Sequence, residues 1–164
     1  MIIKDSMVVI HLAKITLLEK SCNYFEKVII PMGVYNEIMA GKKNEYSEIN
    51  IIEELIQKNK ISIKKIKNKK YSKKVKEFRI SGGEAEAVVL YWQEKANYLA
   101  TDDDNVRKKS ILLSLNVIGT PVIILKLYKD KKIDKGKFLS SVIELKKIGW
   151  FSNSIIDKLL MEAK

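Results

Sequence analysis

The chain has 164 residues and a mass of 18.9 kDa, which suits one compact domain and excludes two ordinary ones. Hydrophobic residues make up 46% and charged residues 31%, which argues against disorder, and no apolar run approaches the roughly 20 residues of a membrane-spanning helix. The formal net charge of +11 favours an anionic partner, while the single cysteine, Cys22, and single histidine, His11, exclude an internal disulfide and a Cys/His zinc cluster.

Short β-branched runs alternate along the chain with segments of helical spacing. In chain order, we expect a strand at 2–4, helices at 6–14 and 16–24, a strand at 28–30, helices at 33–40 and 45–59, a strand at 61–66, a helix from Gly82-Gly83 to Ala96, a strand at 98–100, a helix from the aspartates after it to 115, a strand at 117–118, and C-terminal helices over about 121–164. This alternation predicts an α/β fold with a mainly parallel sheet covered on both faces.

Local signals support several of these boundaries. Either Asp5 or Ser6 can cap the first helix, and Gly41 is placed where a left-handed helix end is cheap. Apolar residues after the Gly-Gly pair recur at the spacing of one buried helical face: Ala85, Val88, Val89, Trp92 and Ala96. We therefore expect one domain over 1–164, and the absence of a basic and then apolar N-terminal stretch favours a cytoplasmic protein.

The positive charge is concentrated between Lys58 and Arg79. Eleven basic residues face one acid in this segment, whereas the rest of the chain holds 20 basic and 19 acidic residues. Such a local excess favours contact with nucleic acid, although 29 of the 31 basic residues are lysine, which is also typical of a general compositional bias. The candidate nucleic-acid contacts are Lys64, Lys65, Lys67, Lys69, Lys70, Lys73 and Lys74.

Acidic residues follow the predicted strands, at the sheet edge where α/β proteins place their ligand sites. Asp5 follows the first strand, three aspartates follow the strand at 98–100, and Glu37 and Glu84 lie on helices one connection away from strands. Any one of them can be explained as a helix cap. Three adjacent acids repel each other, however, so the set favours a divalent cation, and oxygen ligands alone select Mg²⁺ or Mn²⁺ rather than zinc. Such a site next to basic residues suits phosphodiester hydrolysis.

Four segments of the chain together resemble one known family. They are Ile2-Ile3-Lys4-Asp5-Ser6 with Leu12; Ile30-Pro31-x-x-Val34-x-x-Glu37-Ile38; Gly82-Gly83-Glu84-Ala85-Glu86-Ala87; and Leu99-Ala100-Thr101-Asp102-Asp103 through Arg107, followed by Asn116-Val117-Ile118-Gly119-Thr120. In this order they are similar to the PIN-domain ribonucleases, in particular to a prokaryotic branch near the VapC-type toxins. The likeness covers residues 2–120 and leaves the C-terminal helices without a motif.

The resemblance implies a three-layer α/β/α PIN-like domain whose acidic pocket binds Mg²⁺ or Mn²⁺ and cleaves RNA. Carried over by position, the catalytic and metal-binding residues would be Asp5, Glu37, Glu84 and Asp103, with Asp102 as a further ligand and Ser6 and Thr101 as polar neighbours. Spacing alone leaves Glu86 open as an alternative to Glu84, and Asp102 to Asp103. Arg107 either pairs with Asp103 along a helix or faces substrate phosphate.

Three hypotheses of function follow. The first is a metal-dependent endoribonuclease, with an antitoxin partner and a homodimer built through the C-terminal helices if the toxin likeness holds. The second is a catalytically silent RNA-binding or regulatory module on the same fold. The third, a phosphatase, ranks last because Met7 stands where an Asp-x-Asp nucleophile needs its second acid. The segment over 58–79 is interpreted as an RNA clamp, a lid or a surface for an acidic partner.

Overall fold

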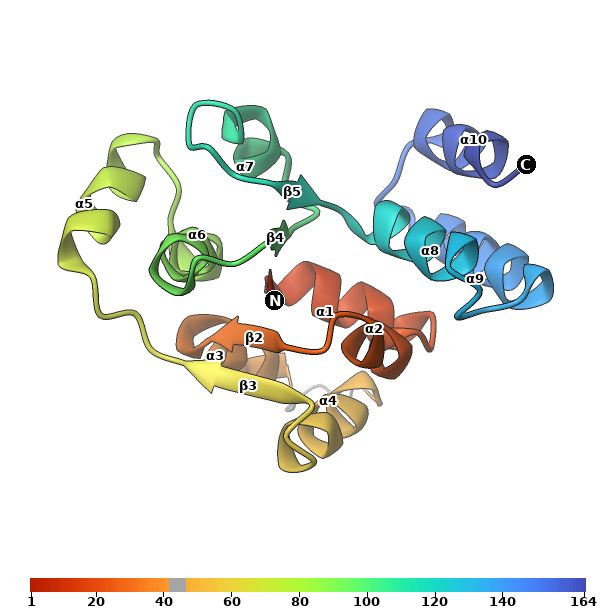
Figure 1. Ribbon diagram of the computed structural model, residues 1–164, viewed down its shortest axis with the longest axis horizontal. Coiled ribbons are helices and arrows are strands. Elements are labelled where there is room, and N and C mark those ends of the chain that lie inside the picture. Colours follow the sequence, from red (N-terminus) through yellow and green to blue (C-terminus); the bar gives the residue numbers. More distant parts are fainter. Residues whose placement is uncertain (42–46) are drawn as a thin grey trace.

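Five parallel strands form one central sheet in the computed structural model, which describes residues 1–41 and 47–164 (Figure 1). The strands are β1 (Ile2–Lys4), β2 (Val28–Pro31), β3 (Ile61–Lys64), β4 (Tyr98–Ala100) and β5 (Val117–Ile118). Their order across the sheet is β3-β2-β1-β4-β5, and every neighbouring pair is parallel. The predicted mainly parallel sheet is confirmed, and the order places the ends of β1 and β4 next to each other at the centre.

Successive residues of each strand enter two separate hydrophobic cores. Ile2 and Val28 pack in one core, whereas Ile3, Ile29 and Leu99 pack in the other. All five are essentially inaccessible to solvent. This explains why the strands read as unbroken apolar runs rather than alternating patterns, since a sheet covered on both faces has no polar side.

Helices cover both faces of the sheet, which gives the expected three layers. Helices that contribute to the core on the Ile2 side are α1 (Ser6–Lys14), α2 (Leu18–Tyr24), α3 (Met32–Ala40), α4 (Glu48–Gln57), α8 (Thr120–Lys129), α9 (Lys135–Ile148) and α10 (Asn153–Glu162). On the Ile3 side lie α5 (Lys69–Glu77), α6 (Gly82–Glu94) and α7 (Asp104–Lys109). Figure 1 shows α6 and α4 on opposite sides of β2 and β3. None of the described helices is long and apolar enough to cross a membrane.

Two helix ends differ from the prediction. Gly41 does end α3, but its φ of −69° and ψ of −14° are right-handed, so the expected left-handed cap is wrong. The second helix begins at Leu18 rather than at residue 16, because Thr16 adopts a φ of 57° and turns the chain. The predicted helix at 45–59 is present as α4 from Glu48 to Gln57, and residues 45 and 46 lie outside the described residues.

The helix expected to continue from the aspartates to residue 115 is also wrong in length. It ends at Lys109, where the Ser110 hydroxyl bonds to the carbonyl of Arg107 and competes with the helical hydrogen bonds. The residues after it form turns, which leaves Ile111 90% and Leu112 72% exposed instead of buried on a helical face.

The lysine-rich segment contains a helix that its composition concealed. Asn68 caps α5 by accepting a hydrogen bond from the backbone N–H of Tyr71 at 3.1 Å, and Val75 is the buried residue that attaches the helix to the core. The preceding strand ends at Lys64, two residues before the predicted end. On α6, burial extends to Leu90, whereas the predicted Trp92 is only half-buried.

Lys4 is fully buried at the end of β1, although its neighbours in the strand are isoleucines. Its Nζ donates a hydrogen bond to Ser21 Oγ at 2.5 Å and lies 5.8 Å from the centre of the Phe25 ring. Burial lowers the pKa of the ammonium group to about 8, and Cys22 opposes this shift. The free energy of folding therefore includes the cost of desolvating a positive charge.

We expect Lys4→Met to raise the free energy of unfolding by about 2 kcal/mol at pH 7, since removing the buried charge gains about 3 kcal/mol and losing the bond to Ser21 costs about 1 kcal/mol. Because the unfolded state binds more protons between pH 8 and 10.5, wild-type stability rises across this range and the gain shrinks. Urea unfolding at pH 7 and pH 10 measures both effects. The exposed Lys14→Met serves as control, and a less stable Lys4→Met at pH 7 would contradict this account.

Candidate active site

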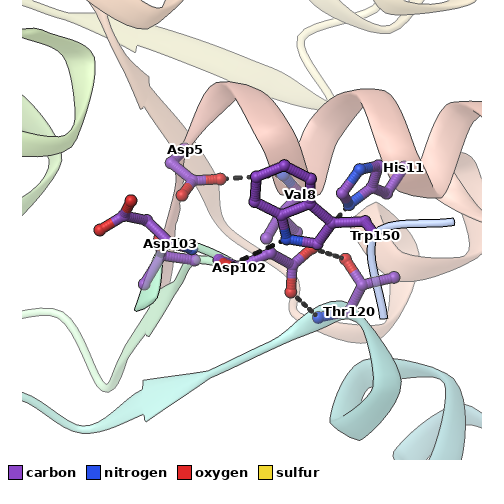
Figure 2. Close-up of polar contacts among 8 residues, drawn as sticks. Asp5, Val8, His11, Asp102, Asp103, Thr120 and Trp150 are labelled. Atoms are coloured by element: carbon purple, nitrogen blue, oxygen red, sulfur yellow. Dashed lines mark hydrogen bonds and ion pairs between the residues drawn. The ribbon is translucent and has the colours of Figure 1, made fainter. Parts of the chain in front are cut away.

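The central strands β1 and β4 carry acidic residues directly after their last residues. The backbone N–H of Asp5 donates to the carbonyl of Ala100 at 3.0 Å, and that of Thr101 donates to Ile118 at 3.0 Å. The backbone pairing thus extends past the strands up to the acids. Asp5 and the Asp102–Asp103 pair therefore lie side by side at the carboxyl edge of the sheet, as the sequence predicted (Figure 2).

Asp5 has one carboxylate oxygen without a partner. Its Oδ1 caps α1 by accepting a hydrogen bond from the N–H of Val8 at 2.8 Å, whereas its buried Oδ2 has no hydrogen-bond partner among residues 1–41 and 47–164. Burial raises the pKa of this carboxyl group to about 7. The Thr101 side chain and the Val8 N–H oppose the rise, and the charges of Asp102 and Glu84 add to it. Within the described part of the chain, no basic side chain pairs with Asp5 to offset the charge of its ionised form.

Asp103 caps the next helix in the same way. Its Oδ1 accepts a hydrogen bond from the N–H of Val106 at 2.8 Å, at the start of α7. Its own N–H donates to Thr101 Oγ1 at 3.1 Å, so the threonine contacts both candidate acids. Figure 2 shows the carboxylates of Asp5 and Asp103 on the same side of the site, with Asp102 turned away from them.

Both carboxylate oxygens of Asp102 are already engaged. Oδ1 accepts from the backbone N–H of Thr120 at 2.8 Å, and Oδ2 contacts the Thr120 hydroxyl at 2.5 Å and His11 Nδ1 at 2.8 Å. The side chain of Asp102 is completely buried. These contacts join the end of β4 to the start of α8 and to α1, so Asp102 has a clear positioning role in the structure.

Helices α3 and α6 cap each other through glutamates. The N–H of Gly83, in the first turn of α6, donates to Glu37 Oε1 at 2.8 Å, and the N–H of Gly33, in the first turn of α3, donates to Glu86 Oε2 at 2.7 Å. Neither helix has a cap from its own preceding residue. A Cβ at position 83 would lie 2.6 Å from the Glu37 carboxylate, so only glycine allows this approach.

The mutual capping separates the two candidate glutamates of α6. Glu86 is used to hold α3, whereas Glu84 is near the acids, because the pKa of its carboxyl group is raised by burial and then by the charges of Asp103 and Glu37. With Asp5 affected by Glu84, the four predicted residues interact electrostatically across one edge of the sheet. The structure therefore places these four residues at one edge of the sheet, and it shows that Glu86 is occupied by its hydrogen bond with Gly33.

A family model described as a PIN domain matches residues 1–164 of the chain. The chain belongs to the PIN-domain family. PIN domains are generally nucleases and usually need divalent metal ions. Membership of the family therefore indicates an activity on nucleic acid. Comparisons with curated proteins and with solved structures gave no match.

The carboxylates of this PIN domain fit a divalent cation in their chemistry. The candidates are all oxygen ligands, and the buried, unpartnered Oδ2 of Asp5 is an atom that a positive ion would satisfy. As placed, however, no three Asp, Glu, His or Cys side chains within 1–41 and 47–164 stand close enough to hold one ion.

Arg107 and Ser6 complete the set of predicted neighbours. Ser6 is the first residue of α1 and follows Asp5 directly. Arg107 is exposed, and across the described part of the chain its guanidinium forms no ion pair, with Asp103 or any other acid. Its Nη1 would lie 2.6 Å from a Cβ at Gly119, which places it against the start of α8 beside Asp102.

Three residues of the site are missing from the sequence prediction. Nothing in the local spacing of His11 reveals its contact with Asp102. Thr120 belongs to the Gly-Thr pair that helped carry the family likeness, so that pair was an available signal. Trp150 donates its indole N–H to the carbonyl of Asp102 at 3.3 Å, and no motif marks it.

Proposed function

We propose that this PIN domain is a metal-dependent endoribonuclease that hydrolyses RNA phosphodiester bonds. The observation that carries the proposal is the buried Asp5 with its unpartnered Oδ2, in electrostatic contact with Glu84. Folding places a costly charge at the ligand-binding edge of the sheet, where a helix cap alone needs only one of its two oxygens. A cation that binds there offsets the cost.

Asp5, Glu84 and Asp103 would hold Mg²⁺ or Mn²⁺, with Glu37 as the fourth acid. A bound ion supplies positive charge next to the scissile phosphate. The chain's own residues place these acids. Thr101 contacts Asp5 and Asp103, and the bond from Gly83 holds Glu37. Asp102 fixes the end of β4 through its contacts with Thr120 and His11, so we assign it a positioning role.

The lysine-rich segment extends from the far end of α6 back to the acids. At its start, Lys64 pairs with Glu94 at 2.5 Å and the N–H of Lys67 donates to Gln93 at 2.8 Å, about ten residues and therefore about 15 Å along α6 from Glu84. After α5, Asn105 of α7 donates to the carbonyl of Arg79 at 3.2 Å. The exposed lysines on this path would bind the RNA backbone: Lys65, Lys67, Lys69, Lys70, Lys73 and Lys74.

Glutamine variants at two positions of α6 test the nuclease proposal. We expect purified protein to cleave RNA with Mg²⁺ or Mn²⁺ and to stop with EDTA. Glu84→Gln should slow this cleavage about 100-fold by removing a ligand charge. Glu86→Gln is the matched control, because its amide oxygen can still accept from Gly33. A time course of the reaction measures the cleavage rate, and sequencing of the fragment ends gives the cleavage position. Equal cleavage by both variants, or cleavage in EDTA, contradicts the proposal.

The triple variant Lys69→Gln, Lys70→Gln, Lys73→Gln tests the binding surface. We expect it to lower RNA affinity about tenfold and to reduce the slope of log affinity against log salt by about 2, since each phosphate contact on a single strand contributes about 0.7. Fluorescence anisotropy over a range of salt measures both quantities. The exposed lysines at 129, 131 and 132, replaced in the same way, remove equal charge elsewhere; an equal loss in that control would refute the assignment.

One observation favours a second candidate, a catalytically silent RNA-binding module. No three potential ligands in the described ranges share an ion-binding distance, which is the arrangement expected if metal never binds. The cleavage experiment separates the two, since the silent module would bind RNA with the same dependence on salt and never cut it. The VapC-type likeness extends the first candidate to a toxin, with an antitoxin partner, a cytoplasmic location and a homodimer through the C-terminal helices.

A further inference from the structure

A pocket of about 630 Å³ lies beside Asp102, between the starts of α7 and α8 and the helix α10. Its volume is within the range of sites for small organic ligands. Its lining includes Asp102 and Arg107 from the candidate active site and Trp150, Val122 and Ile155 from the C-terminal half. The C-terminal helices carry no sequence motif, so this pocket is the point where they approach the site.

The pocket exposes large apolar side chains. Trp150 is 55% exposed, Ile155 41% and Val122 39%, and all three line the same hollow. Apolar groups that are gathered in one concave place usually contact a ligand.

Trp150 is fixed in position while its ring stays accessible. The indole N–H donates to the backbone carbonyl of Asp102 at 3.3 Å, and the ring centre lies 6.4 Å from that of His11, which itself contacts Asp102 (Figure 2). The only hydrogen-bond donor of the side chain is thus used, and what remains for a ligand is aromatic surface. A held, half-exposed indole is suited to stacking on a flat ring.

Charged side chains of both signs line the pocket: Asp102, Asp104 and Glu162 are acidic, and Arg107 and Lys158 are basic. Lys158 and Glu162 lie 3.7 Å apart and neutralise each other, and Asp104 is exposed at the rim. Arg107 is the basic side chain of the lining whose guanidinium forms no ion pair in the ranges 1–41 and 47–164, so it can contact a phosphate. A planar aromatic ring attached to a phosphate is the ligand that matches both this cation and the indole.

We infer that this pocket binds one unpaired base of the nucleic acid, stacked on Trp150, with its phosphate on Arg107. The inference rests on the proposed function and assigns the place where one base of the RNA substrate binds. A base in a fully paired duplex keeps its stacking faces covered and cannot enter the pocket without being extruded. The indole of Trp150 is held by the carbonyl of Asp102, which lies just after the end of β4. A base stacked on the indole would therefore fix where the RNA strand lies relative to the acids.

Binding in EDTA tests the inference without any turnover. We expect a short labelled single-stranded RNA to bind more tightly than the duplex of the same sequence. Trp150→Ala should weaken this binding about 5- to 100-fold, as for a lost base-stacking contact, while Trp150→Phe stays within about threefold of wild type. Ile143→Ala on α9 is the control, since Ile143 is an apolar side chain, 57% exposed, that does not line the pocket.

A series of RNAs with one abasic nucleotide tests the same contact without altering the protein. At one position of the RNA, the abasic nucleotide should weaken binding to the wild type by a similar factor. The same RNA should bind Trp150→Ala about as well as the intact RNA does. Equal binding of intact and abasic strands overturns the inference and assigns the pocket to another ligand, such as an apolar peptide. Base-dependent binding without cleavage in Mn²⁺ supports it while refuting the nuclease, so the two failures are distinguishable.

Discussion

Asp5→Asn is expected to abolish the Mn²⁺-dependent cleavage of RNA and, at the same time, to make the protein more stable. Replacing a residue that is needed only for the fold would make the protein less stable. Asparagine keeps the oxygen that caps α1 at Val8, so the helix start is preserved, but it removes the charge that a cation would need. We expect cleavage to fall about 100-fold or more.

The gain in stability follows from the pKa of Asp5. Burial raises it to about 7 from an ordinary value of 3.8, so the folded state binds more protons than the unfolded state between these values. The free energy of unfolding therefore falls as pH rises from about 4 to 7, and the ionised carboxylate costs about 4 kcal/mol at pH 8. Asp5→Asn removes this cost at pH 8 and brings almost no gain below pH 4.

Urea unfolding at pH 4 and pH 8, without metal, measures the difference. Asp157→Asn on α10 is the control, since this aspartate is exposed and far along the chain from the acids. Adding Mn²⁺ should stabilise the wild type and not Asp5→Asn, because bound metal favours the ionised form. A destabilised Asp5→Asn with full cleavage would show that Asp5 is a helix cap and nothing more.

Thr120→Val is expected to lower the free energy of unfolding by about 3 kcal/mol. The change conserves volume and shape, so its effect comes from the lost hydroxyl contact with Asp102 at 2.5 Å. Both side chains are buried, and Asp102 Oδ2 would keep only His11 as a partner for a buried negative charge. Leaving such a charge with fewer donors is among the costlier changes in a protein core.

The conservative variant Thr120→Ser separates the hydroxyl from the methyl group. It should retain most of the stability, because the hydroxyl can still reach Asp102. Ser154→Ala on α10 removes an exposed hydroxyl and should change the free energy of unfolding by less than about 0.5 kcal/mol. If Thr120→Val costs no more than this control, the contacts of Asp102 do not hold the site together.

Helix α7 and the lysine-rich segment show where local patterns misled the prediction. The helix predicted to reach residue 115 ends at Lys109, and the turns after it leave Ile111 and Leu112 exposed while Leu113 and Leu115 pack in the core. In the opposite case, lysines dominate 69–77 and hide a helix that depends on Asn68 as a cap and on burial of Val75. Spacing describes a face, and only packing decides whether the face is used.

The sequence by itself determined the alternation of strands and helices, the acids that follow β1 and β4, and the basic segment, because strand ends and helix caps depend on residues within a few positions of each other. Tertiary structure alone decided that Glu86 caps α3, since the N–H that it accepts belongs to a residue 53 positions away. It also decided that Trp150 lies against Asp102, 48 positions apart, where no local pattern records the contact.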